Sequence, residues 1–245
     1  MISILFPSAK QLTIEIARQH TPSELNDQSK VARSETRDRI IEAARELFYR
    51  NGYTATGIAQ ILKESGANSG SLYHFFPSKE HLLVAVLERY REMLGPYVMG
   101  PGFEAVSDPI ERVFTVLDGY RQWLQTTDFQ LGCPIGNLAL EVANHHPRAR
   151  ALVRENFEAW CSAIRGQIES ASGRLPEEIG AAALARHVLA TMEGAVMLAR
   201  AYRSFEPFDQ AVNQLRDYFD RLVRDGSDWS VRSALPHHHS EENTE

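Results

Sequence analysis

Residues 54–79, TATGIAQILKESGANSGSLYHFFPSK, decide the fold of this chain. Apolar residues in the first half lie three or four positions apart, as on one face of a helix: Ile58, Ile61 and Leu62. Gly66 favours the left-handed conformation at a helix end, and Asn68 suits the N-cap of a second helix. Pro77 ends the second helix near residue 75, because the residue before a proline avoids helical geometry. Two short helices joined by a glycine turn are therefore predicted.

The second of these helices has an apolar and a polar face. Leu72, Phe75 and Phe76 are predicted to face inward. Small and polar side chains are left for a partner: Ser69, Gly70, Ser71, Tyr73 and His74. A helix this short is only marginally stable by itself, so packing against its neighbours must stabilise it. The arrangement is that of a helix-turn-helix, whose second helix enters the major groove of DNA.

The longer run GYTATGIAQILKESGANSGSLYHFFPSKEHLL resembles the DNA-binding region of the TetR family of bacterial repressors, above all in G-x-x-x-G-S-L-Y-H-F-F-P-S-K-E. With the preceding helix, the resemblance covers Ser34 to Leu83. It implies a homodimer that binds operator DNA and carries a ligand-binding body. The sequence departs from the family at Ala59, at Leu62 and at Ser69, where the family often has a lysine. The family's operator preference therefore does not carry over.

Composition and charge agree with a soluble regulator. The 245 residues are 43% apolar and carry a formal charge of −6. Residues 30–80 carry eight basic and six acidic side chains, so this segment is positive and the remainder carries −8. Cys133 and Cys161 form neither a disulfide framework nor a metal cluster. Without a membrane-length apolar run or a signal peptide, we expect a cytoplasmic protein with no membrane partner.

Helical periodicity without sustained strand alternation predicts an all-α protein. Beyond the helix-turn-helix, helices are expected at about 34–51, from Ser78 to a stop before Gly95-Pro96, and at about 110–125. A shorter helix starts at Pro134 and is closed by Pro147, a long helix then runs to about Ser172, and two more helices follow. We expect four segments: 1–30, a flexible N-terminal extension; 31–80, the helix-turn-helix DNA-binding domain; 81–225, a helical ligand-binding and dimerisation domain; and 226–245, a flexible tail.

Within the DNA-binding domain, two kinds of contact are predicted. Phosphate contacts are assigned to Thr56, Tyr73, Lys79 and Arg37. Base-edge contacts are assigned to Ser69, Ser71 and His74, with Gly70 keeping the helix close to the groove. The alternatives are that Tyr73 is an aromatic residue at the core edge and that the arginines before residue 40 are solvated charges.

A ligand pocket is predicted among the middle helices, lined by Tyr97, Phe103, Trp123, Cys133, Asn137 and Trp160. Asn137 lies on an apolar helix, where a buried amide needs partners. Cys133 precedes Pro134 at a helix start, where the dipole lowers the pKa of a thiol. The run 132–135 also resembles the cysteine region of electrophile-sensing family members. A buried, unreactive thiol is the preferred interpretation, and electrophile sensing through Cys133 is the alternative.

The last two helices carry apolar stripes that predict a dimer interface. One stripe contains Val188, Met192 and Ala195, and the other contains Leu215, Phe219 and Leu222. Two such helices from each of two chains would form a four-helix bundle. The alternative is that both stripes belong to the core of one chain.

Catalysis is not predicted. Glu141 and His145 could share a helix face, but H-E-x-x-H and phosphate-binding glycine loops are absent from the sequence. We expect no metal and no cofactor. A helical binding module without DNA activity is the other alternative. The sequence thus predicts a homodimeric repressor that a small-molecule inducer releases from a palindromic operator.

Overall fold

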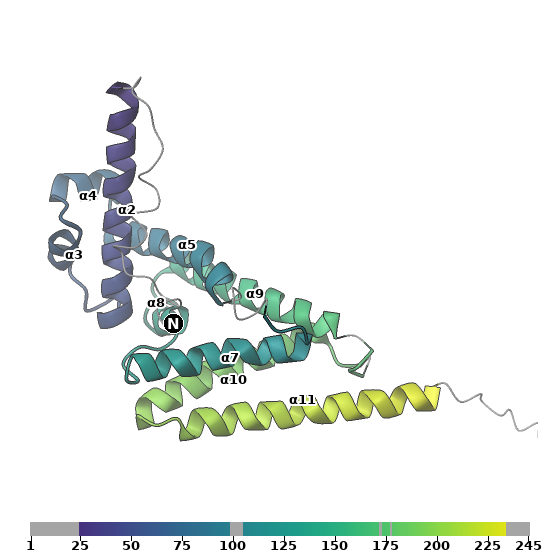
Figure 1. The fold of residues 1–245 in the computed structure, drawn as a ribbon. Coiled ribbons are helices and arrows are strands. Elements are labelled where there is room, and N and C mark those ends of the chain that lie inside the picture. Colours follow the sequence, from purple (N-terminus) through teal and green to yellow (C-terminus); the bar gives the residue numbers. More distant parts are fainter. Residues whose placement is uncertain (1–24, 99–104, 172, 177, 234–245) are drawn as a thin grey trace, which may run out of the picture.

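The computed structural model describes residues 25–98, 105–171, 173–176 and 178–233, and in this part of the chain the regular elements are all helices (Figure 1). Its helices, in chain order, are α2 (Leu25–Asn51), α3 (Ile58–Ser65), α4 (Ser69–Phe75), α5 (Lys79–Val98), α7 (Pro109–Thr126), α8 (Pro134–Val142), α9 (Pro147–Ser170), α10 (Ala181–Tyr202) and α11 (Glu206–Ser233). The prediction of an all-α fold is confirmed.

The small head consists of α2, α3 and α4, and local signals set the ends of its short helices. Gly66 has a φ of 65° and ends α3 in the left-handed region. The Asn68 side chain accepts a hydrogen bond from the backbone N–H of Ser71, 2.8 Å away, and caps α4. Leu72, on the inner face of α4, is fully buried with Ile61 and Phe48. The helix-turn-helix geometry predicted from the sequence is present.

Three helices are longer than predicted. Helix α2 begins at Leu25, so residues 25–30, assigned above to a flexible extension, are helical. Helix α5 continues through Gly95 and Pro96 to Val98, and α11 passes Gly226 to end at Ser233. Adding a residue to an existing helix costs far less free energy than starting one, so single weak helix formers do not end these long helices.

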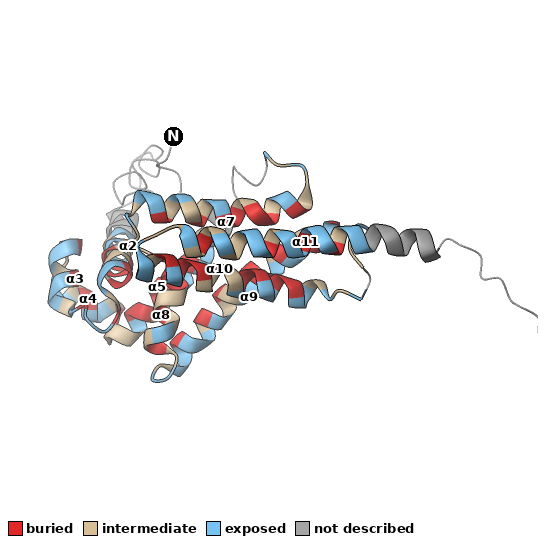
Figure 2. Ribbon diagram, turned by 90° about the horizontal axis from the view of Figure 1, so that it is seen from below, coloured by how far each residue is buried: buried red, intermediate tan, exposed pale blue. Residues whose placement is uncertain are grey.

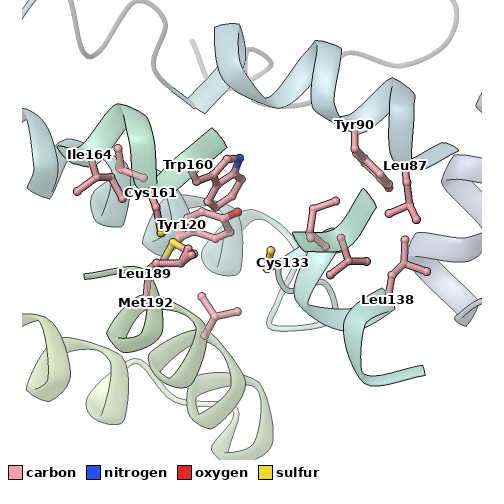
Figure 3. Close-up of a cluster of buried hydrophobic side chains, with 14 of the residues drawn as sticks. Leu87, Tyr90, Tyr120, Cys133, Leu138, Trp160, Cys161, Ile164, Leu189 and Met192 are labelled. Atoms are coloured by element: carbon pink, nitrogen blue, oxygen red, sulfur yellow. The ribbon is translucent and has the colours of Figure 1, made fainter. Parts of the chain in front are cut away.

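The body is a bundle in which α9 packs against α5, α7, α8 and α10, and α10 packs against α11. Buried faces turn toward the bundle interior, and exposed residues form the outer faces (Figure 2). One part of the core gathers Tyr120, Trp160, Cys161, Leu189 and Met192 from three helices (Figure 3). By length and composition α10 is apolar enough to cross a membrane, but here it is a packed helix of this bundle.

The predicted dimer stripes prove to be core. All six residues are at most 7% exposed within a single chain: Val188, Met192, Ala195, Leu215, Phe219 and Leu222. They are covered because α10 and α11 lie side by side and turn these stripes toward each other and toward the bundle interior. Periodicity had identified a buried face but not the segment that covers it. The large apolar side chains that α10 leaves exposed are Met197, Leu198 and Tyr202, and the last two continue the predicted stripe toward the end of the helix.

Candidate nucleic-acid interface and its link to the body

The outer face of α4 is open to a partner. Tyr73 is 51% exposed, and Ser69, Gly70 and His74 are exposed beside it, while Ser71 is half-buried. An exposed Tyr73 does not fit the alternative of a core-edge aromatic. The structure therefore presents the predicted set of small and polar groups on one side of a short helix anchored by Leu72.

Helix α2 adds basic side chains to this surface. The Arg33 guanidinium lies 2.8 Å from Nε2 of His74, across a groove between α2 and α4. Arg37, one turn further along α2, lies over the Phe76 ring at 5.5 Å from its centroid. Arg37 is exposed, so a phosphate contact by Arg37 stays a prediction.

The phosphate contact predicted for Thr56 does not fit the structure. Its side chain is only 1% exposed, and Oγ1 lies 2.7 Å from the carbonyl oxygen of Gly52 and 3.2 Å from that of Leu47. The hydroxyl is therefore turned into the head, where it braces the link between α2 and α3. It was predicted to bind phosphate because hydroxyls often do, but a buried hydroxyl takes the nearest carbonyl acceptor instead.

Lys79 is half-buried at the start of α5. Its Nζ lies 3.4 Å from the carbonyl oxygen of Thr54 and 4.3 Å from the centre of the Tyr53 ring. Partial burial lowers the pKa of Lys79, against the opposing effect of Glu141. The ammonium group still reaches the edge of the head, and its phosphate contact stays a prediction.

Helix α8 joins the body to the head at both of its ends. At the C-terminal end, the Glu141 carboxylate accepts hydrogen bonds from the backbone N–H groups of Tyr53 at 3.2 Å and Thr54 at 2.8 Å. Gly52 has a φ of 86°, and a Cβ at this position would lie 2.7 Å from Glu141. From its spacing to His145, Glu141 was considered only as a metal ligand, and its two N–H bonds give it a different role.

At the N-terminal end of α8, the link runs through Tyr49 of α2. The Tyr49 hydroxyl donates to the carbonyl oxygen of Gly132 at 2.6 Å, and Nε1–H of Trp123 donates to the same hydroxyl at 2.6 Å. Burial raises the pKa of Tyr49, so the hydroxyl keeps its proton and remains a donor. A contact separated by more than 80 residues in the chain leaves no local signal, and Tyr49 was missed for that reason.

The predicted ligand residues only partly come together. Trp123 is half-buried and bonded to Tyr49, while Trp160 is buried beside Tyr120 with ring centres 5.8 Å apart. Phe103 and the side chain of Tyr97 lie outside the described residues. The prediction that these residues line one pocket therefore stays a prediction.

Cys133 and Asn137 belong to a polar cluster between α8 and α10. The Arg200 guanidinium donates to Oδ1 of Asn137 at 2.9 Å and to the carbonyl oxygen of Gln130 at 3.1 Å. The Glu193 side chain bonds to the Cys133 thiol. Among the described residues, Oε1 of Glu193 and Nε of Arg200 are buried without a hydrogen-bond partner. Such groups are costly inside an apolar core unless a further partner satisfies them.

The same cluster decides the chemistry of Cys133. The side chain is 2% exposed, and burial, with a further contribution from the Glu193 carboxylate, raises the pKa of its thiol well above the usual value. Burial also raises the pKa of Glu193. Sγ caps α8 by accepting from the N–H of Gly136 at 3.3 Å, but this favourable contact is outweighed. Burial thus outweighs the dipole effect expected at the start of the helix, and the direction agrees with the preferred interpretation of a buried, unreactive thiol.

The fold and this surface define a class: a helix-turn-helix DNA-binding protein whose head is bonded to a larger helical body. Residues 40–86 match the family model described as bacterial regulatory proteins, tetR family, and residues 109–214 match the C-terminal domain of LmrA/YxaF-like transcriptional regulators. The chain belongs to the TetR family of transcriptional regulators, which confirms the resemblance. It is a regulator and not an enzyme.

Individual relatives of the chain are also transcriptional regulators. An uncharacterized HTH-type transcriptional regulator of Mycobacterium tuberculosis is 34% identical over 186 residues, which cover 74% of this chain and 92% of the relative. The regulator LmrA of Bacillus subtilis is 30% identical over 174 residues, covering 71% and 90%. A TetR regulator structure from Chloroflexus aurantiacus superposes with a TM-score of 0.68 at 31% identity, covering 78% of this chain and 96% of that one.

Proposed function

We propose that this regulator is a cytoplasmic, homodimeric repressor that binds a palindromic operator and leaves it when a small molecule enters the body. The observation that carries the proposal is the double attachment of α8. One end of this helix holds the backbone that leads into α3, through Glu141. The other end contacts both Tyr49 of the head and the polar cluster around Cys133. A change in that cluster would therefore shift the head.

The inducer is expected beside α8 and α10. The buried oxygen of Glu193 and the buried nitrogen of Arg200 are an acceptor and a donor with free capacity among the described residues. Trp123 and Asn137 flank the same region. These groups suit a small, mostly apolar molecule with one or two polar groups. To move occupancy of the operator-binding form from about 99:1 to 1:99, its preference for the released form must be roughly 5.5 kcal/mol.

The dimer is expected to use the outer faces of α10 and α11 in place of the buried stripes. Tyr202 is 71% exposed and Met197 57%, and Leu198 and Tyr218 are also exposed. Exposed large apolar side chains on two adjacent helices suit contact with a second copy of the chain. The resulting contact would still be a four-helix bundle.

The buried surroundings of both cysteines do not favour the electrophile-sensing alternative. Attack on an electrophile requires a thiolate, and the buried Cys133 thiol holds its proton more tightly than a free cysteine does. Cys161, the other thiol, also has a raised pKa because of burial. Neither cysteine has the exposed, electropositive surroundings of a sensor.

The proposal is tested by titrating the purified protein against DNA from the region upstream of its own gene, at two salt concentrations, beside an unrelated duplex. If that region holds no site, selection from a random duplex pool supplies one. Tight, salt-sensitive and sequence-selective binding by a dimer is expected. Tyr73→Ala should weaken binding and leave the dimer intact. Failure to select any duplex at low salt would sink the proposal.

A further inference from the structure

We propose that the groove between α2 and α4 binds a phosphate group of the DNA backbone, with Arg33 as the ligand and His74 as the residue that positions it. The groove is about 540 Å³ and is lined by Arg33, Thr36, Asn68, Gly70, Ser71, His74 and Phe75. Arg33 precedes residue 40, where the match to the family's DNA-binding model begins. The inference rests on the proposed operator binding and adds a contact from outside the helix-turn-helix.

The hydrogen bond between the two side chains orients the guanidinium of Arg33. Arginine has only N–H donors, so Nε2 of His74, 2.8 Å from the guanidinium, must be the acceptor. An imidazole nitrogen brings no negative charge, so it orients the guanidinium without cancelling its charge, and four of the five guanidinium N–H groups stay available for an anion.

The arginines of α2 differ in their partners between the two ends of the helix. Arg45 is bonded to Glu42 at 2.7 Å, and Arg50 is bonded to Glu46. Among the described residues, three arginines of α2 have no carboxylate partner: Arg33, Arg37 and Arg39. Their contacts are an imidazole, an aromatic ring and the Thr36 hydroxyl. Positions 33 and 37 are one turn apart and so share a helix face. The cationic end of α2 is therefore the end beside the recognition helix.

The location of the groove identifies its occupant. Helix α2 runs past α4 toward its own N-terminus (Figure 1). Ser71 and His74 line the groove and also belong to the polar face of α4. When α4 enters the major groove, the bordering strand backbone passes beside it. A guanidinium held in place by an acceptor can then make a bidentate contact to one phosphate. The same chemistry could hold a free phosphate ion, and the experiment separates the two sources.

The experiment compares the wild type with Arg33→Ala on the duplex selected above, at 50 and 200 mM salt. The slope of log affinity against log salt changes by about 0.9 for each phosphate contact, so a dimer that loses two contacts should lose about 1.8 from its slope. The defect of Arg33→Ala should consequently shrink about 12-fold between the two salt concentrations. Arg50→Ala removes the same charge from the other end of α2 and should leave the slope unchanged.

Two further arms test the roles of the two residues. In the first, one phosphate of the duplex at a time is replaced by a neutral methylphosphonate. At one position in each half-operator, this replacement should weaken binding of the wild type but should not weaken binding of Arg33→Ala any further. His74→Gln, which keeps an acceptor for Arg33, should retain more of the salt slope than His74→Ala does.

Each contrary result has a distinct meaning. If the wild type selects an operator but Arg33→Ala keeps the full salt slope, this inference is wrong and the proposed function stands. If no methylphosphonate position depends on Arg33, and inorganic phosphate at constant ionic strength competes only with the wild type, the groove holds a free ion and not the backbone. If the wild type selects no duplex, the proposed function itself fails.

Discussion

Replacing Glu141 by alanine should loosen the head from the body without unfolding either. The carboxylate accepts two backbone N–H groups, from Tyr53 at 3.2 Å and from Thr54 at 2.8 Å. Hydrogen bonds to a charged group contribute about 1.5–3 kcal/mol each when buried. Because the Thr54 bond is exposed and Glu141 is half-exposed, we expect about 2 kcal/mol for the pair. This free energy corresponds to about a 30-fold change in the docking equilibrium.

Amide hydrogen exchange measures this change at the two bonds themselves. In Glu141→Ala, the N–H groups of Tyr53 and Thr54 should exchange about 30-fold faster, while the amide of Leu72, in the core of the head, keeps its protection. Glu141→Gln keeps one acceptor oxygen and should fall between. Glu158→Ala, an exposed glutamate on α9, is the matched control. Unchanged protection of Tyr53 and Thr54 in Glu141→Ala would refute the assignment of α8 as the link.

Other predictions concern single residues. Thr56→Val should lower the free energy of unfolding by about 1 kcal/mol, measured by urea denaturation, because it removes the hydroxyl bonded inside the head. It should leave the salt slope of DNA binding unchanged, and a reduced slope would restore its phosphate role. Cys133 should react with a thiol reagent more slowly than a free cysteine at pH 7, and faster only as the pH rises toward its raised pKa. Rapid labelling of the folded protein at pH 7 would contradict this. Leu198→Glu should convert the dimer to folded monomers in analytical ultracentrifugation, whereas Leu140→Glu, at a position 80% exposed on α8, should not. Equal dimer stability in both variants would place the interface elsewhere.

The helix-turn-helix could be predicted because its signals are local. A left-handed glycine at Gly66, the cap at Asn68 and the break at Pro77 each act within a few residues of the chain. The helical period of the body likewise marks the apolar face of each helix, and most of the marked residues are buried in the structure, with Leu198 and Tyr202 of α10 as exposed exceptions. A period of three and four is a property of one helix and needs no knowledge of its neighbours.

The sequence by itself determined the all-helical class, the position of the recognition helix and the family. The tertiary structure decided which partner each side chain meets. It turned Thr56 inward, covered the stripes on α10 and α11 within one chain, and set Arg33 against His74. It also brought Glu141 to a backbone turn 87 residues earlier in the chain. Such contacts depend on how helices pack, and packing is set by the whole bundle and leaves no mark in the local sequence.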